Sequence, residues 1–313
     1  MDAKKFVEKK IQEIRESAGR KTAVNALSGG LDSSVVAVLA HKALEDKVHN
    51  IFLDTGMMRL NEPETIQSSF EQIGIPVEVK DVSGRFFDAF RGEKDGEAKR
   101  KIFRDTFYKS LGEAVRESGA GCLLQGTIKP DIEETQAGVK TQHNILSQIG
   151  IDPEKQYGFK TIEPLIDLVK WEVREVAEEL GIPRTRFNTM PFLGPGLSGR
   201  VIGEVSRERI HMARLTNNIV EEELMPLEPF QCLAVLFNDQ ATMKGDENAK
   251  GRNYGHIVAV RCVESRDART AQVTEIPYDI LKKVAARITT EVPGVTKVVY
   301  DLTPKPPSTI EYI

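Results

Sequence analysis

Residues 22–34 read TAVNALSGGLDSS, a short apolar run followed by a turn that holds two glycines and three serines. The apolar run predicts a buried strand, and Leu31, Val35 and Leu39 predict a helix with an apolar face. Glycines at such a strand-to-helix turn let the backbone come close to an anion, and the first amides of a helix have no intrahelical acceptor. The stretch therefore predicts a phosphate-binding turn in an α/β fold.

This turn contains no lysine, although many phosphate-binding loops carry one. A Walker A loop reads GxxxxGKS or GxxxxGKT and directs its lysine at the β- and γ-phosphates. Here Asp32 stands beside the predicted cradle instead. Because a carboxylate repels phosphates unless a cation lies between them, Asp32 predicts Mg²⁺. The alternative is that the serines and Asp32 only cap a helix, since these residue types are favoured near helix starts.

Short apolar runs alternate with helical patterns through the first half of the chain. The runs are residues 22–27, 48–54, 75–82 and 121–127. Strands that alternate with helices pair in parallel and carry helices on both faces, so we expect an α/β fold with a doubly wound, mostly parallel sheet. Ligands of such sheets lie beyond the carboxyl ends of the strands, where the glycine turn is expected.

The chain is long enough for two domains. We expect residues 1–187 to form the α/β domain and residues 188–313, which follow a Gly- and Pro-rich stretch, to form a smaller α+β domain. Residues 128–160 show no clear periodicity. A loop of this length inside a domain is usually functional, so we expect a lid over the site there.

Composition excludes several classes of protein. The 313 residues carry a formal net charge of −4, which argues against a nucleic-acid partner held by bulk charge. Three widely spaced cysteines show no CxxC pattern, so zinc and disulfides are not expected, and no apolar stretch is long enough to span a membrane. We expect a cytoplasmic protein with no membrane partner.

The string SGGLDSS resembles the PP-loop (SGGxDS) of the ATP pyrophosphatases, which cleave ATP between its α- and β-phosphates. FLDTGMMRLNEPE, PFLGPGLSGRVIGEV and the tail KPPSTIEYI are similar to strings in the ATP-pyrophosphatase part of GMP synthetases, and this similarity covers nearly the whole chain. It implies ATP as co-substrate and the reaction XMP + ATP + NH₃ → GMP + AMP + PPi. It also implies a homodimer formed through the C-terminal domain.

The resemblance implies a role for each of several groups of residues. The ATP phosphates are held by Ser28, Gly29, Gly30, Leu31, Asp32, Ser33 and Ser34, with Asp32 as metal ligand. The rest of the nucleotide lies near Leu53, Asp54, Arg100, Gly126 and Thr127. The catalytic set comprises Asp32 and the lid residues Asp131, Glu134, Lys140 and His143. XMP is bound by Arg200, Lys305 and Glu311.

Some of these positions also have a simpler interpretation. Without the resemblance, Asp131, Glu134 and Lys140 would be solvated loop residues, and Arg100 would belong to a charged helix face. The chain departs from the family pattern at Gln142 in the lid, at Thr189 and Leu193 before GPGL, and at Ile313. These departures concern lid closure and XMP binding, and they leave the PP-loop unchanged.

No glutaminase domain fits before the PP-loop, and Cys122 lies in a predicted buried strand without a nucleophile elbow. We therefore expect a two-subunit arrangement in which a separate glutaminase supplies ammonia, resembling that of archaea. Two alternatives remain: another PP-loop enzyme, such as an NAD synthetase or a tRNA thiolase, and a nucleotide-binding subunit without catalysis.

Overall fold

The computed structural model describes residues 1–136, 159–183, 190, 192, 194–243, 253–266 and 268–312, apart from the side chains of residues 134–136 and 243. They form two compact units. The first comprises Met1–Thr55, Asn61–Val82 and Asp105–Thr189; the second comprises Gly56–Leu60, Ser83–Arg104 and Met190–Ile313. Because the units interleave along the chain, the domain limits 1–187 and 188–313 remain a prediction.

The first unit is built on a parallel sheet of five strands in the order β3-β2-β1-β4-β5. The strands are β1 (Ala23–Leu27), β2 (Val48–Asp54), β3 (Val77–Asp81), β4 (Cys122–Leu124) and β5 (Lys160–Ile162). The order steps outward from β1 in both directions, which is the arrangement of a doubly wound sheet. The predicted fold class is confirmed.

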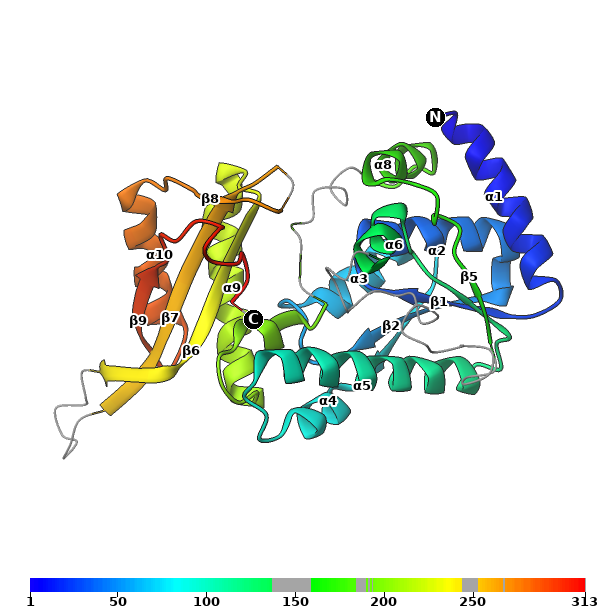
Figure 1. Cartoon of the computed structure of the whole chain (residues 1–313). Coiled ribbons are helices and arrows are strands. Elements are labelled where there is room, and N and C mark those ends of the chain that lie inside the picture. The colour runs from blue at the N-terminus through cyan, green and yellow to red at the C-terminus, as the bar shows by residue number, and fades with distance from the viewer. Residues whose placement is uncertain are drawn as a thin grey trace. The chain divides into compact units, whose positions relative to one another are not determined.

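Helices cover both faces of this sheet (Figure 1). They are α1 (Ala3–Ala18), α2 (Leu31–Leu44), α3 (Glu62–Glu71), α5 (Gly96–Glu117), α6 (Lys129–Gln136) and α8 (Lys170–Glu179). Helices α1, α2 and α8 pack together on one face. On the other face Leu111 and Val115 of α5 pack against Val24, Ile51 and Leu123. Among the described helices, none is both long and apolar enough to cross a bilayer.

The turn between β1 and α2 is tightly enclosed, by a side chain of α3 and by the backbone after β4. Gly29 has a φ of 78°, in the left-handed region, and an added Cβ there would lie 2.8 Å from Ile66 Cδ1. At the end of β4, a Cβ on Gly126 would lie 2.8 Å from the Ser33 nitrogen and 2.9 Å from the Asp32 carbonyl carbon. Glycine at both positions therefore lets β4 and α3 close around the first turn of α2.

The expectation of an irregular segment over about residues 128–160 is wrong at its start. Lys129–Gln136 form helix α6, and Lys160 begins β5. Helix α6 starts where Asp131 accepts a hydrogen bond from the Ile128 amide, 3.0 Å away, while the Lys129 amide donates to the Leu168 carbonyl. This capping contact and a tertiary contact supply order that hydrophobic periodicity does not reveal. Residues 137–158 lie outside the described part of the chain.

The second unit carries a mixed sheet in which β6, β7 and β8 are antiparallel and β9 runs parallel to β7. The strands are β6 (Gln231–Met243), β7 (Asn253–Glu264), β8 (Gln272–Val273) and β9 (Val295–Tyr300). The helices are α4 (Ser83–Phe90), α9 (Arg207–Leu224) and α10 (Tyr278–Glu291), with a 3₁₀ turn over Gly196–Arg200. Helix α9 packs on β6, and α10 packs on α9 and β9.

The C-terminal tail packs on the sheet of the second unit. Ile310 joins an apolar cluster with Leu233, Val235 and Ala259, and Tyr312 packs against it. The tail is therefore part of the core of this unit.

Gly126→Ala is expected to lower the free energy of unfolding by about 1–3 kcal/mol, because the added methyl group overlaps the backbone of α2. Denaturant unfolding measures the change. Gly84→Ala is a matched control, since its Cβ would meet only Arg207 Nη2, at 4.0 Å. Equal stability of the Gly126→Ala variant and the wild type would contradict this close packing.

Candidate functional site

The serines of the turn between β1 and α2 hold its backbone in shape. Ser33 Oγ and Ser34 Oγ both donate to the Gly30 carbonyl, at 3.0 and 2.9 Å. Ser33 Oγ also accepts from the Ser28 amide at 3.2 Å and lies 3.0 Å from Ser28 Oγ. Helix α2 begins at Leu31, and among the described residues no side-chain cap is found at its start, Gly30. Its first amides are therefore suited to the predicted anion cradle, which stays a prediction.

A lysine does lie beside this cradle, although it comes from a distant part of the sequence. Lys170, the first residue of α8, places Nζ 2.8 Å from Asp32 Oδ1 and 2.9 Å from Asp32 Oδ2. Lys170 was not among the residues expected at this site. One signal could have found it: a lysine in the first turn of a helix opposes the helix dipole, so it needs an anion nearby.

Asp32 lies in an electrostatic setting that accepts a further cation. Burial raises the pKa of the Asp32 carboxyl above its ordinary value despite the opposing pull of the Lys170 charge, and the negative charge of Asp131 raises it further. Arg174 also favours the ionised form, but the two basic residues do not compensate the burial. A cation held at Asp32 would therefore favour the ionised form of its carboxyl, as the charges of Lys170 and Arg174 do.

Mg²⁺ fits this arrangement of donors. Carboxylate oxygens are its preferred protein ligands, and it usually keeps water and phosphate oxygens in the rest of its shell. Asp32 could hold the ion, and the charge of Asp131 lies close enough to act on Asp32. Within the described residues, no group of three His, Cys, Asp or Glu side chains could hold a metal ion. Any remaining ligands would thus come from a bound phosphate, from water or from outside the described residues.

The other residues expected around the nucleotide have mixed surroundings. Leu53 belongs to the apolar core of the first unit. Thr127 is fully buried and its hydroxyl donates to Glu163 Oε1 at 2.5 Å. Asp54 ends β2, and its carbonyl accepts from the Val82 amide at 2.9 Å. The structure therefore brings Gly126 and Asp32 together directly, while the nucleotide-binding roles of all these residues stay predictions.

Arg100 lies in the second unit, on α5, and forms a surface ion pair with Glu97 at 3.2 Å. This contact matches the alternative interpretation of a charged helix face. Of the lid residues, Asp131 lies in the first turn of α6. Glu134 also lies on α6, but its side chain is not among those described, and Lys140 and His143 lie outside the described residues. Gln142, Thr189, Leu193 and Ile313 are likewise outside them.

All three cysteines are buried and unpaired. Burial raises the thiol pKa of Cys122, as it does for Cys232 and Cys262. A thiol is a poor nucleophile when its pKa is raised and its surface is covered. The environment of Cys122 therefore agrees with the expectation of an inert core residue.

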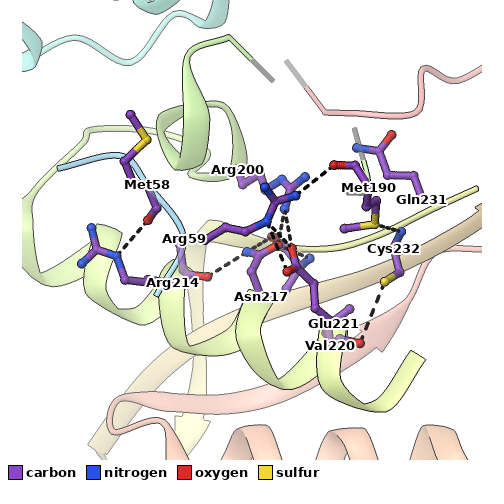
Figure 2. A network of polar contacts seen from close by, with 12 residues as sticks. Met58, Arg59, Met190, Arg200, Arg214, Asn217, Val220, Glu221, Gln231 and Cys232 are labelled. Carbon is purple, nitrogen blue, oxygen red and sulfur yellow. Dashed lines mark hydrogen bonds and ion pairs between the residues drawn. The ribbon is translucent and has the colours of Figure 1, made fainter. Parts of the chain in front are cut away.

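In the second unit, two of the residues expected to bind XMP contact each other. Arg200 has no exposed surface, and it donates to Glu311 through Nε at 3.3 Å and through Nη2 at 3.1 Å. Its third bond goes to Asn217 Oδ1 at 2.7 Å, on α9 (Figure 2). Glu311 also accepts from Gln231 Nε2 at 2.6 Å. Arg200 and Glu311 thus form a buried, hydrogen-bonded ion pair.

Lys305, the third residue expected to bind XMP, is placed differently. Its backbone pairs with Ala271 in both directions, at 2.8 and 3.0 Å. Its Nζ lies at the surface and donates to the Ala268 carbonyl at 2.8 Å. The contacts described for its ammonium include no acidic partner, so this group could bind an anion.

The parallel sheet and the glycine cradle define the chain as a PP-loop nucleotide-binding protein. Two family models match it: NAD synthase over residues 2–106 and GMP synthase C terminal domain over residues 218–312. One subunit of the glutamine-hydrolyzing GMP synthase of Archaeoglobus fulgidus is 48% identical over 313 residues, covering 100% of both chains. The corresponding subunit of Pyrococcus abyssi is 47% identical over 316 residues, covering 100% of both, and that of Methanocella arvoryzae is 46% identical over 313 residues, covering 100% of this chain and 99% of the other. The chain belongs to this family of GMP synthase subunits.

Arg200→Met is expected to lower the free energy of unfolding by about 3–5 kcal/mol, because it leaves the buried Glu311 carboxylate without its cation. Thermal or denaturant unfolding measures this loss. Lys305→Met is the matched control and should change stability by less than about 0.5 kcal/mol, since its ammonium lies at the surface. Similar losses in the two variants would mean that the Arg200 pair does not stabilise the unit.

Proposed function

We propose that this chain is the synthetase subunit of a two-subunit GMP synthase. It would adenylate the C2 oxygen of XMP with ATP, release pyrophosphate, and let ammonia displace AMP to give GMP. The observation that carries the proposal is the similarity to a GMP synthase subunit over the full length of both chains. The match to the GMP synthase C terminal domain supports it independently of the nucleotide-binding half.

The chemistry suits the residues of the PP-loop. The oxygen at C2 is a poor leaving group until it is adenylated, and the other product of that step is pyrophosphate. The first amides of α2 and the Ser28 hydroxyl are suited to hold the departing pyrophosphate, and Asp32 is suited to hold Mg²⁺. Catalysis would rest mainly on positioning and on charge stabilisation at the α-phosphate.

The remaining roles follow from the family resemblance. Asp131, Glu134, Lys140 and His143 would act over the adenylation site. Lys305 would bind the XMP phosphate, and Arg200 and Glu311 would belong to the same half of the site. The relatives are named as one subunit of a glutamine-hydrolyzing enzyme, which supports a separate glutaminase partner that supplies ammonia. A cytoplasmic location and a homodimer formed through the C-terminal domain belong to the same proposal.

The discriminating assay uses the purified chain with Mg-ATP, ammonium and XMP. A fall in XMP absorbance, with release of AMP and pyrophosphate, is the expected result. Glutamine in place of ammonium should give no turnover without the glutaminase. Because the NAD synthase model matches residues 2–106, deamido-NAD is the control substrate. Turnover of deamido-NAD but not of XMP would overturn the proposal, as would ATP binding without any turnover.

Lys170→Met is expected to weaken the binding of metal-free pyrophosphate by about tenfold, because the cradle loses the ammonium that is paired with Asp32. Isothermal titration calorimetry measures the dissociation constant with and without Mg²⁺. Lys9→Met is the matched control, since Lys9 forms a surface ion pair with Glu13 on α1. Unchanged pyrophosphate binding by Lys170→Met would mean that Lys170 serves only as the counterion of Asp32.

A further inference from the structure

Four charged side chains of the second unit form a cluster that joins distant parts of the sequence. Figure 2 labels three of them, Arg59, Arg200 and Glu221. Arg59 comes shortly after strand β2 in sequence. Its Nε donates to both carboxylate oxygens of Glu221 on α9, at 3.0 and 3.2 Å. Arg200 Nη1 lies 4.0 Å from Glu221 Oε1. Arg200 in turn holds Glu311 of the tail. Two cations and two anions thus form a neutral chain of contacts.

Phe192 links the two arginines of this cluster. The Arg59 guanidinium lies 4.1 Å from the centroid of the Phe192 ring, and the Arg200 guanidinium lies 4.7 Å from it. Two positive groups against one ring would repel each other without an anion close to both. Glu221 is that anion, because it contacts Arg59 and lies near Arg200. Its carboxylate therefore keeps both guanidiniums in place.

Further hydrogen bonds of arginine side chains fix the backbone before Arg59 and before Arg200. Arg59 Nη2 donates to the Met190 carbonyl at 3.2 Å, which anchors the start of the segment that leads to Arg200. Arg214, two turns before Glu221 on α9, donates to the Met58 and Gly56 carbonyls at 2.9 and 2.6 Å. Helix α9 therefore holds the segment that carries Arg59 at two points.

Arg200 is fully buried and three of its donors are occupied by Glu311 and Asn217. A substrate phosphate could reach it only if the side chains that cover it moved, because Arg200 has no exposed surface. The geometry therefore favours a role in which Arg200 orients the tail, while the exposed ammonium of Lys305 remains available to an anion.

We propose that Arg59 and Glu221 are positioning residues for the XMP half of the reaction. They hold the Arg200 guanidinium against Phe192, and Arg200 holds Glu311, so that the tail carrying Lys305 keeps one docked position. Neither residue touches the substrate. This inference rests on the proposed function, because it assigns XMP to the tail. Removal of the Glu221 charge loosens the tail and weakens XMP binding, and leaves ATP binding unchanged.

The test compares Glu221→Gln with Glu222→Gln, a matched control on the next residue of α9. Glu222 accepts from Asn218 and Arg287 and takes no part in the cluster. Two readouts are taken below the unfolding temperature of each variant. The first is the steady-state KM for XMP and for ATP, together with kcat. The second is the rate at which carboxypeptidase releases the last three residues, followed by mass spectrometry, which reports tail docking without any turnover.

Glu221→Gln is expected to raise the KM for XMP and the rate of tail release each by about tenfold, with the KM for ATP unchanged within about twofold. Glu222→Gln should match the wild type in both readouts. Equal tail release from Glu221→Gln and wild type would overturn the proposal, as would an equal rise in the KM for XMP and for ATP. Absence of XMP turnover in the wild type would instead overturn the proposed function, and tail release would still decide whether the cluster docks the tail.

The double variant Arg59→Met with Glu221→Gln separates lost position from an unpaired charge. It removes one cation and one anion, so the net charge of the cluster is unchanged. If the pair positions the tail, the double variant still releases it faster than the wild type. Recovery of wild-type release and of the wild-type KM for XMP would show that only charge balance matters, and would overturn the proposal.

Discussion

The close packing of α3 and of the residues after β4 around the start of α2 is the constraint on which the first unit depends. Gly29 takes a left-handed conformation beneath Ile66, and Gly126 brings the end of β4 against the backbone of Asp32 and Ser33. Side chains at these two glycines would force the segments apart. Because they are absent, the first amides of α2 lie at the carboxyl edge of the sheet, beside the residues that follow the neighbouring strand.

The same packing explains how a phosphate cradle can lack a lysine of its own. The chemistry of an ATP pyrophosphatase needs charge compensation for a pyrophosphate that leaves, and a loop lysine is only one way to supply it. Here the ammonium comes from the start of α8 and is held by Asp32. Asp32 thereby pairs with a protein cation, and its carboxylate oxygens are of the kind that Mg²⁺ prefers.

In the second unit, charged side chains form ion pairs with one another. Its arginines and glutamates are paired with one another and partly buried, and such pairs contribute to a unique arrangement more than to net stability. The cluster ties residues of an early segment, the Gly- and Pro-rich stretch, α9 and the tail into one body. A tail that would usually be mobile is therefore an ordered part of the unit.

Much of this protein could be predicted from local sequence. Strand and helix periodicity determined the doubly wound sheet, and the glycines and serines after β1 determined the cradle, since both depend on residues close together in the chain. Helix α6 was missed because a cap and a contact to Leu168 create it. Lys170, 138 residues from Asp32, and Glu221, 162 residues from Arg59, could not be paired from the sequence. Only the tertiary structure decided which charges meet, because ion pairs across such separations depend on how whole elements pack and leave no periodic trace in the chain.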